Sequence, residues 1–132
     1  MYYLDSNTCI YYLNGRYTSV KENILKHAPA EIRIPVIVKC ELLAGAYKSE
    51  RKRETLKKVN AFLGNFEIEP FCDEMAGVYA QIRSDLELQG KKIGPNDTLI
   101  ASIVKYHNGT LVTHNTKEFE RVKGLKTIDW VV

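Results

Sequence analysis

The sequence predicts an α/β protein, a three-layer α/β/α sandwich with a mostly parallel central sheet. Short apolar segments typical of strands alternate along the chain with helical segments longer than one turn. Crossovers of that length join parallel strands and cover both faces of the sheet. The chain of 132 residues shows no repeat, low-complexity tract or Pro/Gly/Ser linker, and it matches the usual domain length of about 100–150 residues. We therefore expect one domain spanning residues 1–132.

The N-terminal half is expected to contain three strands and four helices. Ser6 is expected to cap the first helix and Gly15 to end it, because a side-chain oxygen favours a helix start and glycine favours the left-handed end. In order, the expected elements are a strand at Tyr2–Leu4, helices at Ser6–Leu13 and Ser19–His27, a strand at Ile32–Ile34, helices at Pro35–Tyr47 and within 48–63, and a strand at Phe66–Ile68.

The C-terminal half continues the alternation. Asp73 is expected to cap a long helix, and Pro95 to open another, because proline suits the first helical position. The expected elements are a helix at Asp73–Leu88, a loop at Gln89–Gly94, a helix at Asn96–Tyr106, a strand at Thr110–Thr113, a short helix capped by Asn115, and an edge strand within Lys126–Trp130.

Two acidic residues occupy positions where the helical pattern favours apolar ones. Glu41 lies in the apolar stripe between Ile37 and Ala44, and Asp97 shares a helix side with Ile100. Residues three and four apart share a helix face, so both carboxylates are expected to point inward. An unpaired carboxylate there costs several kcal/mol. A divalent cation bound by both is the leading explanation.

A third acid, Asp5, directly follows the first strand. Asp5, Glu41 and Asp97 are 36 and 56 residues apart, so only the fold can bring them together, at the carboxyl ends of the strands. An oxygen-only ligand set suits Mg²⁺ or Mn²⁺ and disfavours zinc. Such a metal lowers the pKa of a bound water and neutralises phosphate charge, while a free carboxylate deprotonates the water. The pattern indicates metal-dependent phosphodiester hydrolysis.

Each of these acids also has a purely structural explanation. Asp5 followed by Ser6 is a common capping pair. Asp97 in a first helical turn suits the helix dipole. For Glu41, at mid-helix, the alternative is a buried ion pair with Arg or Lys. Any single acid is weak support for a site, and the set of three is stronger.

Further polar residues accompany these acids. Ser6, Thr113 and Asn115 are candidates to hydrogen-bond a metal-bound water, with ordinary turn bonding as the alternative. Glu118 falls three residues after Asn115, which is the spacing of a capping box. The alternative is that Glu118 belongs to the acidic site.

Candidate RNA contacts come from basic residues. The densest basic run, residues 48–58, is interleaved with Glu50 and Glu54, which favours a solvated helix face over phosphate contact. Lys91 and Lys92 lie on a glycine-flanked loop and are the better candidates, because loops often carry function. The eight tyrosines are scattered, so we expect core and interface roles rather than a stacking platform.

Composition sets the remaining expectations. A net charge of +3 permits an anionic partner without requiring one. Cys9, Cys40 and Cys72 include no close pair and are expected as buried free thiols in a reducing compartment. No basic and apolar leader follows Met1, and no apolar stretch approaches the ~18 residues of a membrane span. We expect a cytoplasmic protein without a membrane segment.

Six segments also occur in a family-like order. They are YLDSN (3–7), ELLAG (41–45), IGPNDTLIA (93–101), LVTHNTKEF (111–119), RVKGL (121–125) and DW (129–130). Together they resemble the PIN-domain family and, within it, the VapC toxins of bacterial toxin–antitoxin pairs. The resemblance covers essentially the whole chain.

This resemblance implies an Mg²⁺-dependent endoribonuclease acting on structured RNA, frequently tRNA. It also implies a homodimer, neutralised by a VapB-type antitoxin whose tail fills the acidic groove. Asp5, Glu41 and Asp97 match the three main acids of the family, which bind the metal. Many members carry a fourth acid where this chain has Asn115. Members with the same Asn-Thr-x-Glu-Phe pattern resemble this chain and use the later Glu, here Glu118, as the fourth catalytic residue.

Two rival functions remain open at this stage. One is an Asp-based phosphotransfer domain, since such domains also open with a strand and an Asp. The phosphatases among them need a second Asp two residues on, where this chain has Asn7. The other is a scaffold that binds RNA or a partner protein without hydrolysis, to which Asn115 in place of an acid points.

Overall fold

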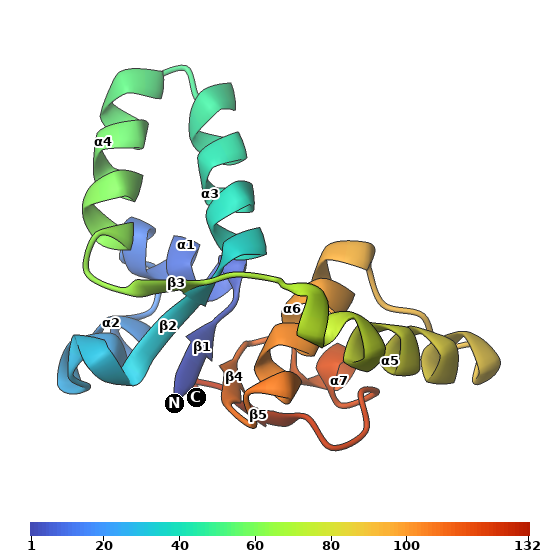
Figure 1. Ribbon diagram of the computed structural model, residues 1–132. Helices are drawn as coiled ribbons and strands as arrows, with labels where there is room; N and C mark the ends of the chain where they lie inside the picture. The colour runs from blue at the N-terminus through green and yellow to red at the C-terminus, as the bar shows by residue number, and fades with distance from the viewer.

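The computed structural model describes all 132 residues and has the predicted fold class (Figure 1). Its five strands form one sheet in the order β3-β2-β1-β4-β5, and every neighbouring pair is parallel. The strands are β1 (Tyr2–Leu4), β2 (Ile32–Pro35), β3 (Glu67–Glu69), β4 (Thr110–Val112) and β5 (Lys126–Ile128). Each lies within two residues of its predicted position, and β5 is the predicted edge strand.

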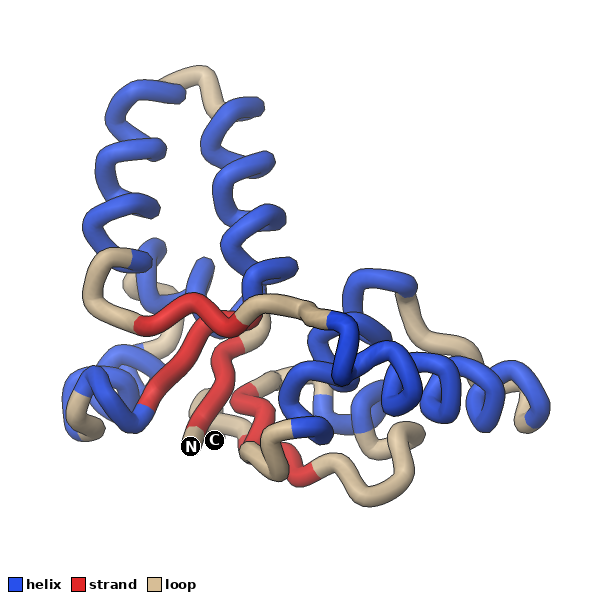
Figure 2. The backbone as a smooth tube through the Cα atoms, in the orientation of Figure 1, coloured by secondary structure: helices blue, strands red, loops and turns tan.

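Helices cover both faces of this sheet. In Figures 1 and 2, α1 and α2 lie on one side, and α5, α6 and α7 on the other. Helices α3 and α4 rise together beyond the ends of the strands, as an antiparallel pair that we call the α3–α4 arm. The helices are α1 (Ser6–Asn14), α2 (Thr18–Lys26), α3 (Val36–Lys48), α4 (Lys52–Leu63), α5 (Ala76–Leu88), α6 (Pro95–Tyr106) and α7 (Thr116–Phe119), with short 3-10 helices at Pro29–Glu31 and Asp73–Met75.

The strand order changes direction between β1 and β4. From β1 the chain proceeds outward to β2 and β3, then returns through α5 and α6 to β4 on the other side of β1. Because parallel crossovers are right-handed, the connections that follow β1 and β4 leave toward opposite faces. A crevice forms between them at the carboxyl ends, where open α/β sheets bind ligands. Asp5 follows β1 and Thr113 follows β4, so both lie at this crevice.

The core holds these strands and α6 in place. Leu4, Leu111 and Val112 in the two central strands are fully buried, as expected for a parallel sheet covered on both faces. In α6, residues 100–104 are all buried. The helix is therefore packed on all sides just after its first turn, and this packing fixes the position of Asp97.

Two predicted helix caps are wrong. Ser6 does not cap α1, because the cap is Asp5, whose Oδ1 accepts a hydrogen bond from the backbone N–H of Thr8 at 2.9 Å. Asp73 does not cap α5, because it begins a separate 3-10 helix, and neither helix start has a side-chain cap bond. The first correction matters for function, since it turns the Asp5 side chain into the crevice.

The cysteines are all free, as expected, but they differ in burial. Cys9 is buried and Cys72 is half-buried. Cys40 is exposed, so the expectation of a buried thiol is wrong there: Val38 and Leu42 take the core-facing side of α3. None of the helices combines the length and the apolarity that crossing a membrane requires.

The close approach of Gly109 to Tyr3 allows a stability prediction. A Cβ at position 109 would lie against Cε1 and 2.7 Å from Cδ1 of the buried Tyr3 ring. Overpacking of this kind costs about 1–3 kcal/mol, so Gly109→Ala is expected to lower the free energy of unfolding by about 2 kcal/mol in a urea titration. The matched control is Gly77→Ala, because nothing lies within 4 Å of a Cβ there. Equal stability of the two variants would contradict this packing.

Candidate functional site

Asp5 is the most deeply buried of the predicted acids, with 6% of its surface exposed. Its N–H donates to the carbonyl of Val112 at 3.1 Å and extends the pairing of β1 with β4. Its carboxylate accepts hydrogen bonds from the N–H of Thr8 and from the Thr113 side chain. Burial raises the pKa of Asp5, while these hydrogen bonds favour the charged form and limit the rise. The crevice therefore holds a carboxylate that Thr8 and Thr113 orient.

Glu41 joins α3 to two other helices. Its Oε1 accepts a hydrogen bond of 2.6 Å from the Ser6 hydroxyl on α1, and its Oε2 one of 3.4 Å from the Asn96 amide on α6. Glu41 is half-buried rather than in the core, and it forms no ion pair with Arg or Lys. The ion-pair explanation for this residue is therefore wrong. The sequence analysis did not single out Asn96, whose only signal is its place between Pro95 and Asp97.

The raised pKa of Asp97 indicates that the other acids lie near it. Burial is the main cause that raises the pKa of Asp97 to about 6, and the negative charges of Glu118, Glu41 and Asp5 add to the rise in that order. The helix dipole does not account for this residue alone, since its effect on the pKa would be the opposite. The fold thus brings four carboxylates from four separate segments into one crevice.

Glu118 is held by Asn115 rather than by a helix cap. The side-chain amide of Asn115 donates to Oε2 of Glu118 at 2.7 Å, and no side-chain hydrogen bond caps α7. The N–H of Asn115 in turn donates to Oγ1 of Thr113 at 3.0 Å. Asn115 takes the predicted N-cap position of α7, but its side chain bonds Glu118 instead of capping the helix. The chain of contacts from Thr113 through Asn115 links Glu118 to Asp5.

The four carboxylates share the crevice without a compensating cation from the chain. None of Asp5, Glu41, Asp97 and Glu118 forms an ion pair with Lys, Arg or His. No group of three or more His, Cys, Asp or Glu side chains is close enough together to hold a metal ion directly. The carboxylates therefore interact through longer-range repulsion, and their role as metal ligands stays a prediction. Their chemistry, oxygen donors only, fits Mg²⁺ or Mn²⁺.

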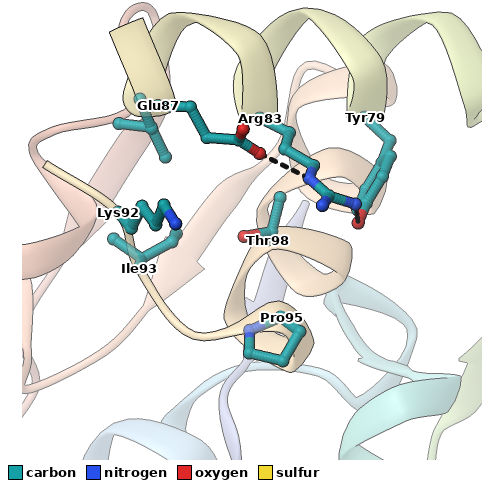
Figure 3. Close-up of a pocket in the computed structure, with 8 residues that line it drawn as sticks. Tyr79, Arg83, Glu87, Lys92, Ile93, Pro95 and Thr98 are labelled. Atoms are coloured by element: carbon teal, nitrogen blue, oxygen red, sulfur yellow. Dashed lines mark hydrogen bonds and ion pairs between the residues drawn. The ribbon is translucent and has the colours of Figure 1, made fainter. Parts of the chain in front are cut away.

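The loop with Lys91 and Lys92 leads into the first turn of α6. Both lysines are exposed, and Arg121 holds the loop by donating to the carbonyl of Lys92 at 3.1 Å. Figure 3 shows Lys92 across a hollow from Arg83, whose Nε lies 2.7 Å from a Glu87 oxygen. The two lysines are therefore accessible beside the α6 end of the crevice, and RNA contact by them remains a prediction.

The basic run at residues 48–58 lies on the α3–α4 arm, and all of its Lys and Arg residues are exposed. Lys52 lies over the ring of Tyr47 at 4.7 Å, and Arg51 lies 3.8 Å from Glu54. Such contacts are typical of a solvated helix face. They agree with the interpretation that the sequence favoured for this run.

Comparisons with known proteins agree with this fold and identify the family. A family model described as "PIN domain" matches residues 2–125. Among curated proteins, the chain is 39% identical over 131 residues to Ribonuclease VapC2 of Rickettsia felis, covering 98% of both chains. It is 34% identical over 127 residues to the tRNA(fMet)-specific endonuclease VapC of Shigella flexneri, covering 96% of both.

Solved structures give the same result. The chain superposes with a TM-score of 0.91 and 38% identity on a chain of VapBC2 from Rickettsia felis bound to a DNA fragment from its promoter, covering 98% of both chains. With DNA-bound VapBC from Salmonella typhimurium the TM-score is 0.92 at 31% identity, covering 98% of this chain and 97% of that one.

The raised pKa of Asp97 predicts a pH-dependent stability. A carboxyl whose pKa is higher in the folded than in the unfolded protein stabilises the fold at low pH, and this contribution is lost as the pH rises through about 6. Without divalent ions, Asp97→Asn is therefore expected to raise the free energy of unfolding at about pH 7.5 by about 1 kcal/mol, allowing for solvent screening of a half-exposed group. Near pH 4 the gain should vanish.

Urea unfolding in a chelating buffer at both pH values measures this effect. The matched control is Asp85→Asn, because Asp85 is exposed on α5. A gain for Asp97→Asn that does not change between the two pH values would show that the pKa of Asp97 is not raised in the folded protein.

Proposed function

Because this chain belongs to the PIN-domain family, and within it to the VapC-type ribonucleases of toxin–antitoxin pairs, we propose that it is an Mg²⁺-dependent endoribonuclease that cleaves structured RNA, with tRNA as the substrate class. The observation that carries the proposal is the set of four carboxylates at the β1–β4 crevice. They have no cation from the chain, and their mutual repulsion helps to raise the pKa of Asp97 to about 6.

Three of these acids are the proposed metal ligands. Asp5, Glu41 and Asp97 supply only hard oxygen donors, which suit Mg²⁺ and allow Mn²⁺. Like charges repel by about 4 kcal/mol at ~4 Å and an effective dielectric near 20, and a divalent ion reverses the sign. When bound, the metal supplies Lewis acidity toward the phosphate and lowers the pKa of a water.

The chain's own groups then orient the site. Ser6 and Asn96 hold the two oxygens of Glu41, and Thr113 hydrogen-bonds the carboxylate of Asp5. We assign Glu118 the role of proton acceptor from the attacking water. Asn115 engages only Oε2 of Glu118, which leaves Oε1 available for that hydrogen bond. Asn115 thus acts as a positioning residue for Glu118. The Thr113 hydroxyl in turn holds Asn115 by accepting a hydrogen bond from the Asn115 backbone N–H.

The proposed partner is a VapB-type antitoxin, whose tail occupies a groove between α1 and the α3–α4 arm. This groove has a volume of about 310 Å³ and reaches Glu41. A tail that fills it with apolar side chains would end at the acids, where it would exclude RNA. The residues that line the groove are Ile10, Leu13, Asn14, Glu41, Leu42, Gly45, Ala46, Thr55, Lys58 and Val59.

Two further properties come from the family resemblance and belong to the proposal. We propose that the protein acts in the cytoplasm, where its RNA substrates are found. We also propose that it forms a homodimer, which light scattering on the purified chain would test.

Removal of one central acid tests the nuclease assignment. Asp97→Asn removes a metal ligand and is expected to lower the rate of tRNA cleavage in Mg²⁺ buffer at least about 100-fold. Cleavage is followed on gels with the purified, antitoxin-free protein. Asp85→Asn should cut at the wild-type rate, and a chelator should stop cleavage until Mg²⁺ is added back. An Asp97→Asn protein that cleaves tRNA as fast as wild type would refute the site.

Neutralisation of the toxin by a co-expressed antitoxin tests the proposed groove. Ile10 lines the groove and is 39% exposed, so Ile10→Asp places a charge against an apolar tail. We expect cells that co-express this variant with the product of the neighbouring antitoxin gene to stop growing, while the purified variant keeps its RNA cleavage. Leu25→Asp, at an exposed position on α2 that is 63% accessible, is the matched control. Full neutralisation of the Ile10→Asp toxin would exclude this groove as the docking site.

A further inference from the structure

A cation held by two aromatic rings lies in the turn between α1 and α2. The guanidinium carbon of Arg16 is 5.6 Å from the centre of the Tyr11 ring and 5.2 Å from that of Tyr17. The two rings meet edge to face, with centres 4.8 Å apart. The N–H of Arg16 donates to the carbonyl of Tyr11 at 3.1 Å, which fixes the backbone of the turn. The sequence analysis expected no such platform, because the tyrosines are scattered in the chain.

This Arg16 cluster is connected to the acidic crevice by His114. The His114 ring packs against Tyr11 and Tyr17, with ring centres 6.3 and 6.0 Å away. Its Nδ1 lies 2.8 Å from an Asp129 oxygen, which anchors the ring to the segment after β5. His114 lies between Thr113 and Asn115, which orient Asp5 and Glu118. Neighbouring Cα atoms are about 3.8 Å apart, so the His114 backbone lies directly beside these two residues of the crevice.

The charge of Arg16 has no partner within the protein. Arg16 is exposed and forms no ion pair with Asp or Glu, whereas four of the five other arginines are paired with an acid or bonded to a backbone carbonyl. Contact with two rings restricts the guanidinium without using its N–H donors. A restricted, unpaired guanidinium loses little freedom when it binds, and its planar fork matches the oxygens of a phosphate.

We propose that Arg16, held by Tyr11 and Tyr17, binds a backbone phosphate in a single-stranded stretch of RNA that extends from the cleavage site. This inference rests on the proposed ribonuclease function and adds a substrate-binding residue to it. An acid-only crevice repels an anionic polymer at neutral pH, so cationic groups at its border are needed to hold the strand. Lys91 and Lys92 precede Asp97 at the start of α6, and the Arg16 cluster adjoins the crevice through His114, next to Thr113.

RNA fits this cluster better than the antitoxin does. The groove proposed for the antitoxin is formed by α1 with the α3–α4 arm, and five of its ten lining residues are hydrophobic. Arg16, Tyr11 and Tyr17 are not among them. Aromatic rings beside an arginine are a common surface for unpaired nucleotides, since bases stack on rings and on guanidinium planes.

The test measures RNA binding without cleavage. In the Asp97→Asn background, binding of a short fluorescein-labelled single-stranded oligoribonucleotide is followed by anisotropy at several salt concentrations. Arg16→Gln is expected to weaken binding about tenfold and to reduce the slope of log K against log salt by about 0.7, as for one lost phosphate contact. Arg16→Lys keeps the charge and should restore the slope. Arg53→Gln, at an exposed position on α4 with no ion pair, makes the same charge change and should leave both values unchanged.

Each result decides the proposal. If Arg16→Gln binds RNA within twofold of the parent, or matches Arg53→Gln, Arg16 does not contact RNA. If Arg16→Gln lowers the melting temperature but leaves the slope of log K against log salt unchanged, the role of Arg16 is structural and the proposal is wrong. If it abolishes neutralisation by the co-expressed antitoxin while RNA binding is unchanged, the surface belongs to the protein partner. A wild-type chain that binds RNA through Arg16 yet cleaves none would refute the ribonuclease proposal and leave this inference standing.

Discussion

Uncompensated negative charge at the β1–β4 crevice is the constraint on which the rest of the site depends. The fold gathers four acids there and pairs none of them with a lysine or an arginine. An arginine in the crevice would lower the pKa of Asp97 and stabilise the folded protein, but it would also occupy the carboxylates. The folded chain therefore leaves these charges unpaired, as the proposed metal site requires.

Neutral donors hold the carboxylates in place instead. Hydroxyl, amide and backbone N–H groups orient a carboxylate without cancelling its charge, and the hydrogen bonds to charged groups contribute about 1.5–3 kcal/mol each. Ser6 and Asn96 act in this way on Glu41, and Thr8 and Thr113 on Asp5. The residue types around the acids are thus as informative as the acids. They exclude a set of structural ion pairs and fit the proposed metal site.

The strands could be predicted from the sequence, and the acids that the fold gathers in one crevice could be singled out, because both depend on local patterns. Strand positions follow from short apolar runs, and Glu41 and Asp97 were conspicuous by breaking helical periodicity. The contacts that complete the site could not be predicted, because they join residues far apart in the chain: Asn96 reaches Glu41 across 55 positions, and Ser6 reaches it across 35. The Arg16 cluster was missed for a different reason: Tyr11, Arg16 and Tyr17 are close in the sequence, but the geometry of the turn between α1 and α2 decides whether their side chains meet. Only His114 joins them from a distant part of the chain.

The position of Glu41 has a consequence for how the site is assembled. Asp5 is fixed by the sheet, and Asp97 by the packing of α6, but Glu41 lies on the α3–α4 arm, which rises away from the sheet (Figure 1). Its hydrogen bonds to Ser6 and Asn96 are therefore also contacts between the arm and the two sides of the crevice. The same carboxylate orients the arm and serves the site. A ligand that draws Glu41 toward Asp5 would act on the arm as well, so the proposed cation site and the neighbouring groove share one structural element, α3.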